Sequence, residues 1–88
     1  PIMPGISICN INTAGGVILP GTQSKVFYRG NPVATEGSPV SPHGSHIGAV
    51  MIQGSAKVNI MGMPVVFAGC RASCDDVANG QADFTTTM

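Results

Sequence analysis

The segment Lys25-Val26-Phe27-Tyr28-Arg29-Gly30-Asn31-Pro32-Val33 returns 32 residues later, from position 25 to position 57, as Lys57-Val58-Asn59-Ile60-Met61-Gly62-Met63-Pro64-Val65. Lys, Val, Gly, Pro and the final Val coincide in the two copies, and Gly37 and Gly69 extend the match at the same spacing. A repeat of this length is typical of proteins in which similar units pack together to bury their apolar faces.

Each copy is predicted to form a β-hairpin. Residues 25–28 and 57–61 are rich in β-forming side chains. Glycine and proline at 29–32 and 61–64 predict turns, and we expect the return strands over Val33–Thr35 and Val65–Ala68. We expect helix to be nearly absent, because no window shows an apolar period of 3.6 residues over more than two turns.

A third, truncated copy is predicted at Gly80-Gln81-Ala82-Asp83-Phe84, which mirrors Gly54-Ser55-Ala56-Lys57-Val58. A single hairpin cannot bury its own apolar face. We therefore expect an all-β fold in which hairpin repeats surround a pseudo-threefold axis and their connecting loops gather at one end. The longest of these loops is 37–54.

The composition narrows the functional class. The 88 residues favour one domain, spanning 1–88, and its 43% hydrophobic residues are too many for a disordered chain. Charged residues are only 9% and the net charge is zero, so no basic surface points to a nucleic acid partner. With 5% aromatic residues the core is thin, which predicts that a metal, a disulfide or a partner adds stability.

The sequence contains neither a membrane span nor a signal peptide. No run of about 18 apolar residues is present, and the first five residues lack the basic and apolar regions of a secretory signal. We therefore expect the chain to be made in the cytoplasm, with any export following another route. Its three cysteines are an odd number, which excludes a full disulfide framework.

The candidate metal ligands are Cys9, His43, His46 and Cys74. Cys9 precedes the hairpin that starts at Gly21, the two histidines precede Gly54, and Cys74 precedes Gly80. In a threefold arrangement the loops that carry them would meet at one end. Two thiolates and two imidazoles form a tetrahedral structural zinc site with no position left for water; iron accepts the same ligands. Cys70 lies outside this loop pattern and is interpreted as a core residue, as a replacement for Cys9, or as a disulfide partner of Cys74.

Catalysis is not predicted. Ser45 lies between the two histidines, but no acidic residue nearby is placed to orient a catalytic triad. Asp75 and Asp76 directly follow Cys74, and they are interpreted as a solvated turn or as acceptors for histidine N–H groups around a metal.

These segments resemble the PAAR-repeat proteins, which form the spike tips of type VI secretion systems and contractile-tail phages. The likeness covers residues 5 to 84 and is carried by Gly54-Ser55-Ala56-Lys57-Val58, Gly62-Met63-Pro64-Val65-Val66, Pro42-His43-Gly44-Ser45-His46, and Ser73-Cys74 before Gly80. The arginine of the family tetrapeptide is absent, since the two copies have Pro32-Val33-Ala34-Thr35 and Pro64-Val65-Val66-Phe67. Members usually bind zinc through three histidines and one cysteine. Ala14 stands where many carry a histidine, so Cys9 is the expected substitute and Cys70 the alternative.

The resemblance implies a small cone with one structural zinc near its apex. Its base would sit on a trimeric β-helical spike, of the valine-glycine-repeat or phage central-spike type, and sharpen it for puncturing a target envelope. The resemblance further implies transient contact with the target membrane, recruitment of secreted effectors, and delivery outside the cell or presence in a virion tail. The alternatives are a free-standing zinc-stabilised binding module and a small metallo-hydrolase.

Overall fold

Three backbone hydrogen bonds close a ring in the interior of the protein. In the computed structural model, which describes residues 5–81 and 84–85, the N–H of Ser7 donates to Val66 O, that of Val66 to Ala34 O, and that of Ala34 to Ser7 O, each at 3.0 Å. Antiparallel bridges flank the ring at Ile6–Phe67, Ile8–Val33 and Thr35–Val65. Each segment donates to one neighbour and accepts from the other, so the predicted pseudo-threefold arrangement is confirmed.

Two units of the threefold carry matching hairpins. Strand β3 (Phe27–Tyr28) pairs with β4 (Asn31–Pro32), and β5 (Asn59–Ile60) pairs with β6 (Met63–Pro64). The two turn residues between the strands have positive φ in both cases, 51° and 83° in the first hairpin and 53° and 78° in the second. These angles define type I′ turns, whose twist matches that of the strands. Each return strand therefore begins two residues earlier than predicted, and its proline lies within the strand.

The third unit is built from both ends of the described chain. The N–H of Ile6 donates to Phe84 O, as the N–H of Val65 donates to Val58 O in the second unit. Gly5 also forms an antiparallel bridge with Thr85. Phe84 thus occupies the position of Val58, as the predicted third copy requires. Ala82 and Asp83 of that copy lie outside the described residues.

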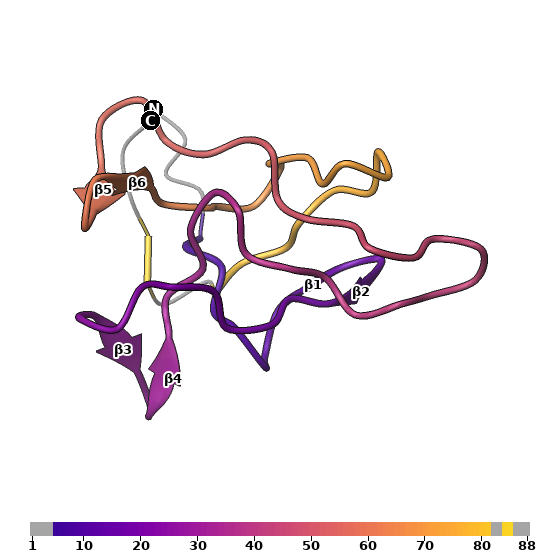
Figure 1. The fold of residues 1–88 in the computed structure, drawn as a ribbon. Helices are drawn as coiled ribbons and strands as arrows, with labels where there is room; N and C mark the ends of the chain where they lie inside the picture. Colours follow the sequence, from indigo (N-terminus) through magenta and orange to yellow (C-terminus); the bar gives the residue numbers. More distant parts are fainter. Residues whose placement is uncertain (1–4, 82–83, 86–88) are drawn as a thin grey trace.

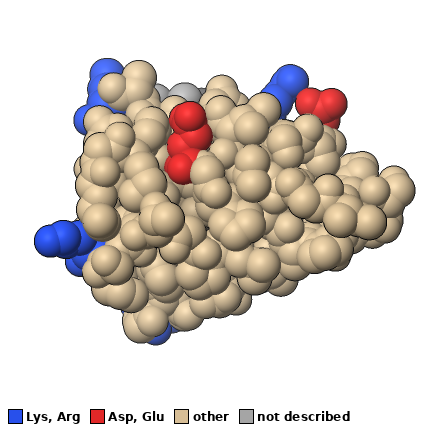
Figure 2. Space-filling view, viewed as in Figure 1, with Lys and Arg blue, Asp and Glu red and all other residues tan. Residues whose placement is uncertain are grey.

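Three further hairpins extend to the end of the molecule that lies away from β3 to β6 (Figure 1). The first joins β1 (Thr13–Ala14) to β2 (Gly16–Val17). The second is closed by the bridge Pro39–Val50 and the third by Arg71–Val77. We call 13–17, 39–50 and 71–77 the tip hairpins. The molecule tapers toward them from a broad end that carries β3 to β6 (Figures 1 and 2).

The core is divided along the axis. Toward the tip hairpins, small buried side chains such as Ala14, Ala34 and Ala72 pack with Ile18, Met51 and others. Toward the broad end, a second cluster contains Ile6, Ile8, Val33 and Val65. Among residues 5–81 and 84–85 there is no helix, and hence none long and apolar enough to cross a membrane. The fold is the small all-β cone expected from the sequence.

Candidate metal centre

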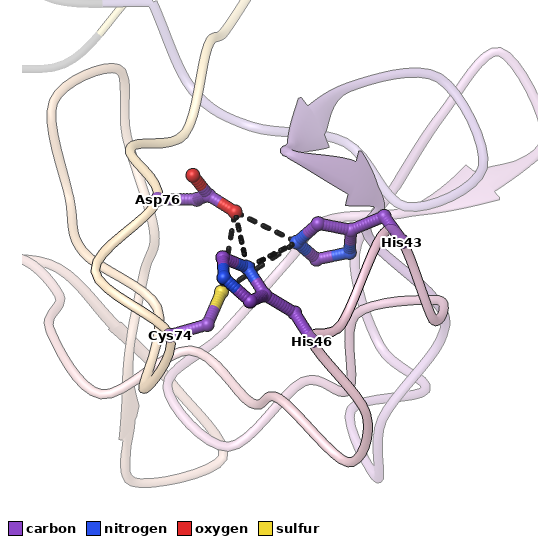
Figure 3. A group of neighbouring side chains, drawn as sticks. All are labelled: His43, His46, Cys74 and Asp76. Carbon is purple, nitrogen blue, oxygen red and sulfur yellow. Dashed lines mark hydrogen bonds and ion pairs between the residues drawn. The ribbon is translucent and has the colours of Figure 1, made fainter.

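Two of the three tip hairpins bring together four side chains that could hold a metal ion. His43 and His46 come from the second tip hairpin, and Cys74 and Asp76 come from the third (Figure 3). One ligand atom from each residue lies within 4.8 Å of all the others. All four residues are partly buried, so an ion held between them would be accessible from solvent.

A tight turn places the two histidines on the same side of their hairpin. The N–H of His46 donates to His43 O at 2.8 Å, and the N–H of His43 donates to His46 O at 3.1 Å. Gly44, between them, has φ of 55°, which is a conformation that glycine adopts without steric cost. The two imidazole rings meet edge to face with their centroids 4.9 Å apart.

Three of the separations between donor atoms are close to those around a tetrahedral ion. Zinc bonds of about 2.0–2.1 Å to nitrogen and about 2.3 Å to sulfur separate neighbouring donors by about 3.3–3.6 Å. His46 Nδ1 lies 3.1 Å from His43 Nε2, and Cys74 Sγ lies 3.6 Å from His43 Nε2 and 3.3 Å from Asp76 Oδ2. The pair His43 Nε2–Asp76 Oδ2 is closer, at 2.7 Å, which is the length of a charge-assisted hydrogen bond.

The ring of His43 is oriented by the backbone. Its Nδ1 lies 2.7 Å from the carbonyl oxygen of Ser41, and because a carbonyl can only accept, Nδ1 carries the proton. Nε2 faces the other donors: in the protonated ring it donates to Asp76 Oδ2, and in the neutral ring its lone pair is free for a metal. The pKa of His43 is raised, first by this bond to Ser41 and then by Asp76. The pKa of Asp76 is lowered by hydrogen bonds from His43, Cys74 and His46.

Three of the four residues predicted as ligands are brought together, and Cys9 is not. Cys9 is fully buried in the core cluster on the tip side, and its thiol donates to Leu19 O at 3.4 Å. Its neighbour Asn10 has a positive φ, as Gly37 and Gly69 do at the corresponding positions of the other two units. Cys9 therefore lies at the end of a central segment and does not belong to a tip hairpin. Burial raises the pKa of the Cys9 thiol, which disfavours the thiolate that a metal needs.

The alternative ligand Cys70 does not join the group either. It is fully buried in the same core cluster, and desolvation raises the pKa of its thiol. The fourth donor in the group is Asp76, which sequence reasoning treated as a turn residue or as an outer partner of a histidine. Its position directly after Cys74 was the available signal. What makes it a donor is the hydrogen bond from Ala72 N to Asp76 O at 2.9 Å, which folds the third tip hairpin back on itself.

Fold and donor group together define a small threefold β-protein with a potential metal centre between its tip hairpins. The PAAR motif family model matches residues 10–80, which is most of the 88 residues. The chain therefore belongs to the PAAR motif family, and the resemblance found from the sequence is confirmed. A search of curated proteins found no match.

The metal-free and zinc-loaded forms are expected to respond to pH in opposite directions. The raised His43 pKa stabilises the metal-free fold fully below the unfolded histidine pKa of about 6.5, and this contribution is lost as the pH rises through the folded value. The lowered Asp76 pKa stabilises the fold above about pH 4, and that contribution is lost as the pH falls through the folded value. Metal-free protein should therefore be most stable in weak acid.

If the donor group binds zinc, the trend near neutrality should reverse, because zinc competes with protons for imidazole and thiol. Thermal melts between about pH 6 and pH 8, with a chelator and with excess zinc, measure both slopes. The melting temperature should fall with pH in chelator and rise with pH in zinc. Parallel slopes in the two series would show that these groups do not bind zinc.

Proposed function

We propose that this protein is a spike tip: it caps a trimeric β-helical spike of a type VI secretion system or a contractile-tail phage and sharpens it for puncturing a target envelope. The observation that carries this proposal is a single chain of the PAAR motif family with three similar segments around one axis, linked by the ring of Ser7, Ala34 and Val66. Only a protein with such an axis presents equivalent surfaces to all three chains of a trimer.

The broad end has the properties of a partner-binding surface. Phe27 in β3 and Met61 in the turn between β5 and β6 are 53% and 52% exposed. Among the described strands, β5 pairs with β6 alone, and an outer strand of this kind can pair with another chain. Lysine and arginine side chains lie along the broad end in Figure 2, and a further basic side chain lies beside an acidic one on the upper edge of the tapering half. An apolar surface rimmed by polar groups is typical of stable interfaces.

Within this function the metal has a structural role. We propose that His43, His46 and Cys74 hold one zinc ion and thereby fasten the second and third tip hairpins together. When bound, the ion would link segments far apart in the sequence, as in other small domains with thin cores. Asp76 lies beside these three residues as a candidate fourth ligand, and a zinc ion with four protein ligands has no position for an activated water. The proposed role is therefore mechanical and not enzymatic, with delivery outside the producing cell or in a virion tail and with secreted effectors as further partners.

The experiment that tests capping is size-exclusion chromatography with light scattering, on the protein mixed with a trimeric β-helical spike fragment. One copy of the chain should bind per trimer, because one pseudo-threefold molecule fills the axis. A free-standing binding module would leave the trimer alone in its peak. Three copies per trimer would also contradict the proposal, since they would place the chain on the sides of the spike.

A further inference from the structure

The first tip hairpin reaches the donor group but supplies no donor. Gly15, at its turn, has φ of 83°. A Cβ atom at this position would collide with Asp76 Oδ2 and would lie 2.6 Å from His43 Nε2. Real Cβ atoms essentially never approach a heavy atom this closely. The turn therefore points directly at the place where the donors of the other two tip hairpins meet.

The neighbouring glycine packs against the same histidine from another side. A Cβ atom on Gly16 would lie 2.7 Å from His43 Nδ1 and would collide with Ser41 O. The Gly15-Gly16 pair thus forms a surface of bare backbone against the imidazole of His43 and the carboxylate of Asp76. Any side chain in this turn would displace one of these two groups.

The carboxylate of Asp76 lies where a ligand lies and not where an outer partner of a ligand lies. An outer carboxylate accepts from the ring nitrogen that faces away from the metal. In His43 that nitrogen is Nδ1, and it already donates to Ser41 O. Asp76 Oδ2 instead lies at Nε2, 2.7 Å away, and the same oxygen is 3.1 Å from His46 Nδ1 and 3.3 Å from Cys74 Sγ. One oxygen atom thus contacts all three other donor atoms.

We propose that Asp76 is the fourth ligand of a divalent cation of the zinc and cobalt class, and that Gly15 keeps the first tip hairpin clear so that Asp76 can take this place. The inference rests on the proposed function for the existence of a metal site and goes beyond it in naming the fourth ligand. Two neutral imidazoles, one thiolate and one carboxylate balance the two positive charges of the ion. The loaded centre is then electrically neutral, which lowers the cost of keeping it partly buried.

The test uses the isolated protein with cobalt(II) and zinc(II) as probes. Tetrahedral cobalt bound to one thiolate gives visible and near-ultraviolet absorption, and zinc competition against it measures affinity. Asp76→Asn should weaken zinc binding by more than the roughly 10–100-fold typical of an outer partner. Gly15→Ala should weaken it strongly although it removes no donor. Asp75→Asn is the matched control: Asp75 is exposed and outside the donor group, so affinity should stay unchanged.

Asp76→Cys separates a ligand from a neighbour. If position 76 binds the ion, this variant regains tight binding, and its thiolate-to-cobalt charge-transfer absorption about doubles because two sulfurs are bound. Wild-type cobalt spectra with unchanged intensity in Asp76→Cys, or unchanged zinc affinity in Asp76→Asn, would overturn the assignment while leaving the metal site in place. Absence of any metal binding by the wild-type chain would overturn it together with the proposed zinc role. Capping is measured separately with the spike fragment.

Discussion

Cys74→Ser is expected to reduce the zinc content of the purified protein from about one ion per chain to nearly none. Serine keeps the shape of the side chain, but it has no sulfur and its hydroxyl is not ionised at neutral pH. An ion present at about a thousandfold above its dissociation constant stabilises the folded state by about 4 kcal/mol. For a domain of this size, each kcal/mol shifts the melting temperature by about 4–8 °C. The zinc-loaded protein should therefore lose about 15–30 °C on this substitution.

The control for this variant is Cys9→Ala, which also removes a thiol. Cys9 is fully buried and lies outside the donor group, so the variant should keep its zinc and lose only the modest stability of a smaller core side chain. Elemental analysis of both variants measures their zinc content, and thermal melts measure their stability. Zinc loss in Cys9→Ala with retention in Cys74→Ser would reverse the roles assigned to the two cysteines.

Val66→Asp is expected to unfold the protein even when zinc is present. Val66 is fully buried and belongs to the ring of three hydrogen bonds. An uncompensated buried charge costs about 3–5 kcal/mol, and the lost burial of valine adds about 1.5–3 kcal/mol. A domain of this length has a total stability of only roughly 4–13 kcal/mol. Loss of amide dispersion in the proton NMR spectrum is the expected readout.

The same charge at the surface should have almost no effect. Ile47 is 82% exposed and lies on the second tip hairpin, next to His46. Ile47→Asp should change the free energy of unfolding by no more than about 0.5 kcal/mol in urea titrations, as is usual for surface positions. A folded Val66→Asp protein with native dispersion would show that the three central segments are not the core of the fold.

The repeat could be recognised from the sequence because each hairpin depends on a few residues with special backbone or packing requirements. Gly30 and Gly62 each occupy the second turn position, where φ is positive, and the valines that follow pair around the axis. The strand boundaries predicted from the sequence were less accurate than the repeat itself. Proline was interpreted as the end of pairing, whereas Pro32 and Pro64 stand opposite Phe27 and Asn59 within the hairpins, because a turn of two residues is sufficient.

The donor group was only partly predictable, because the tip hairpins differ in length. The sequence predicted that His43, His46 and Cys74 lie close together, because the repeat places their loops at one end. Cys9 was included on the assumption that the first loop matches the others. The first tip turn in fact lies beyond it, between Ala14 and Gly16. Asp76 was assigned another role because an acidic pair beside a turn is usually solvated, and only the folded hairpin shows where its carboxylate points.

The pairing of Gly5 with Thr85 means that one of the three units is assembled from two segments that lie far apart in the sequence. The order in which the three modules are encoded is therefore independent of how they pack. A circular permutant, with positions 88 and 1 joined and new ends opened between Arg29 and Gly30, would contain the same three modules around the same axis. The order of the units along the chain is thus separable from the shape of the protein. What the sequence must preserve is the ring of hydrogen bonds that joins Ser7, Ala34 and Val66.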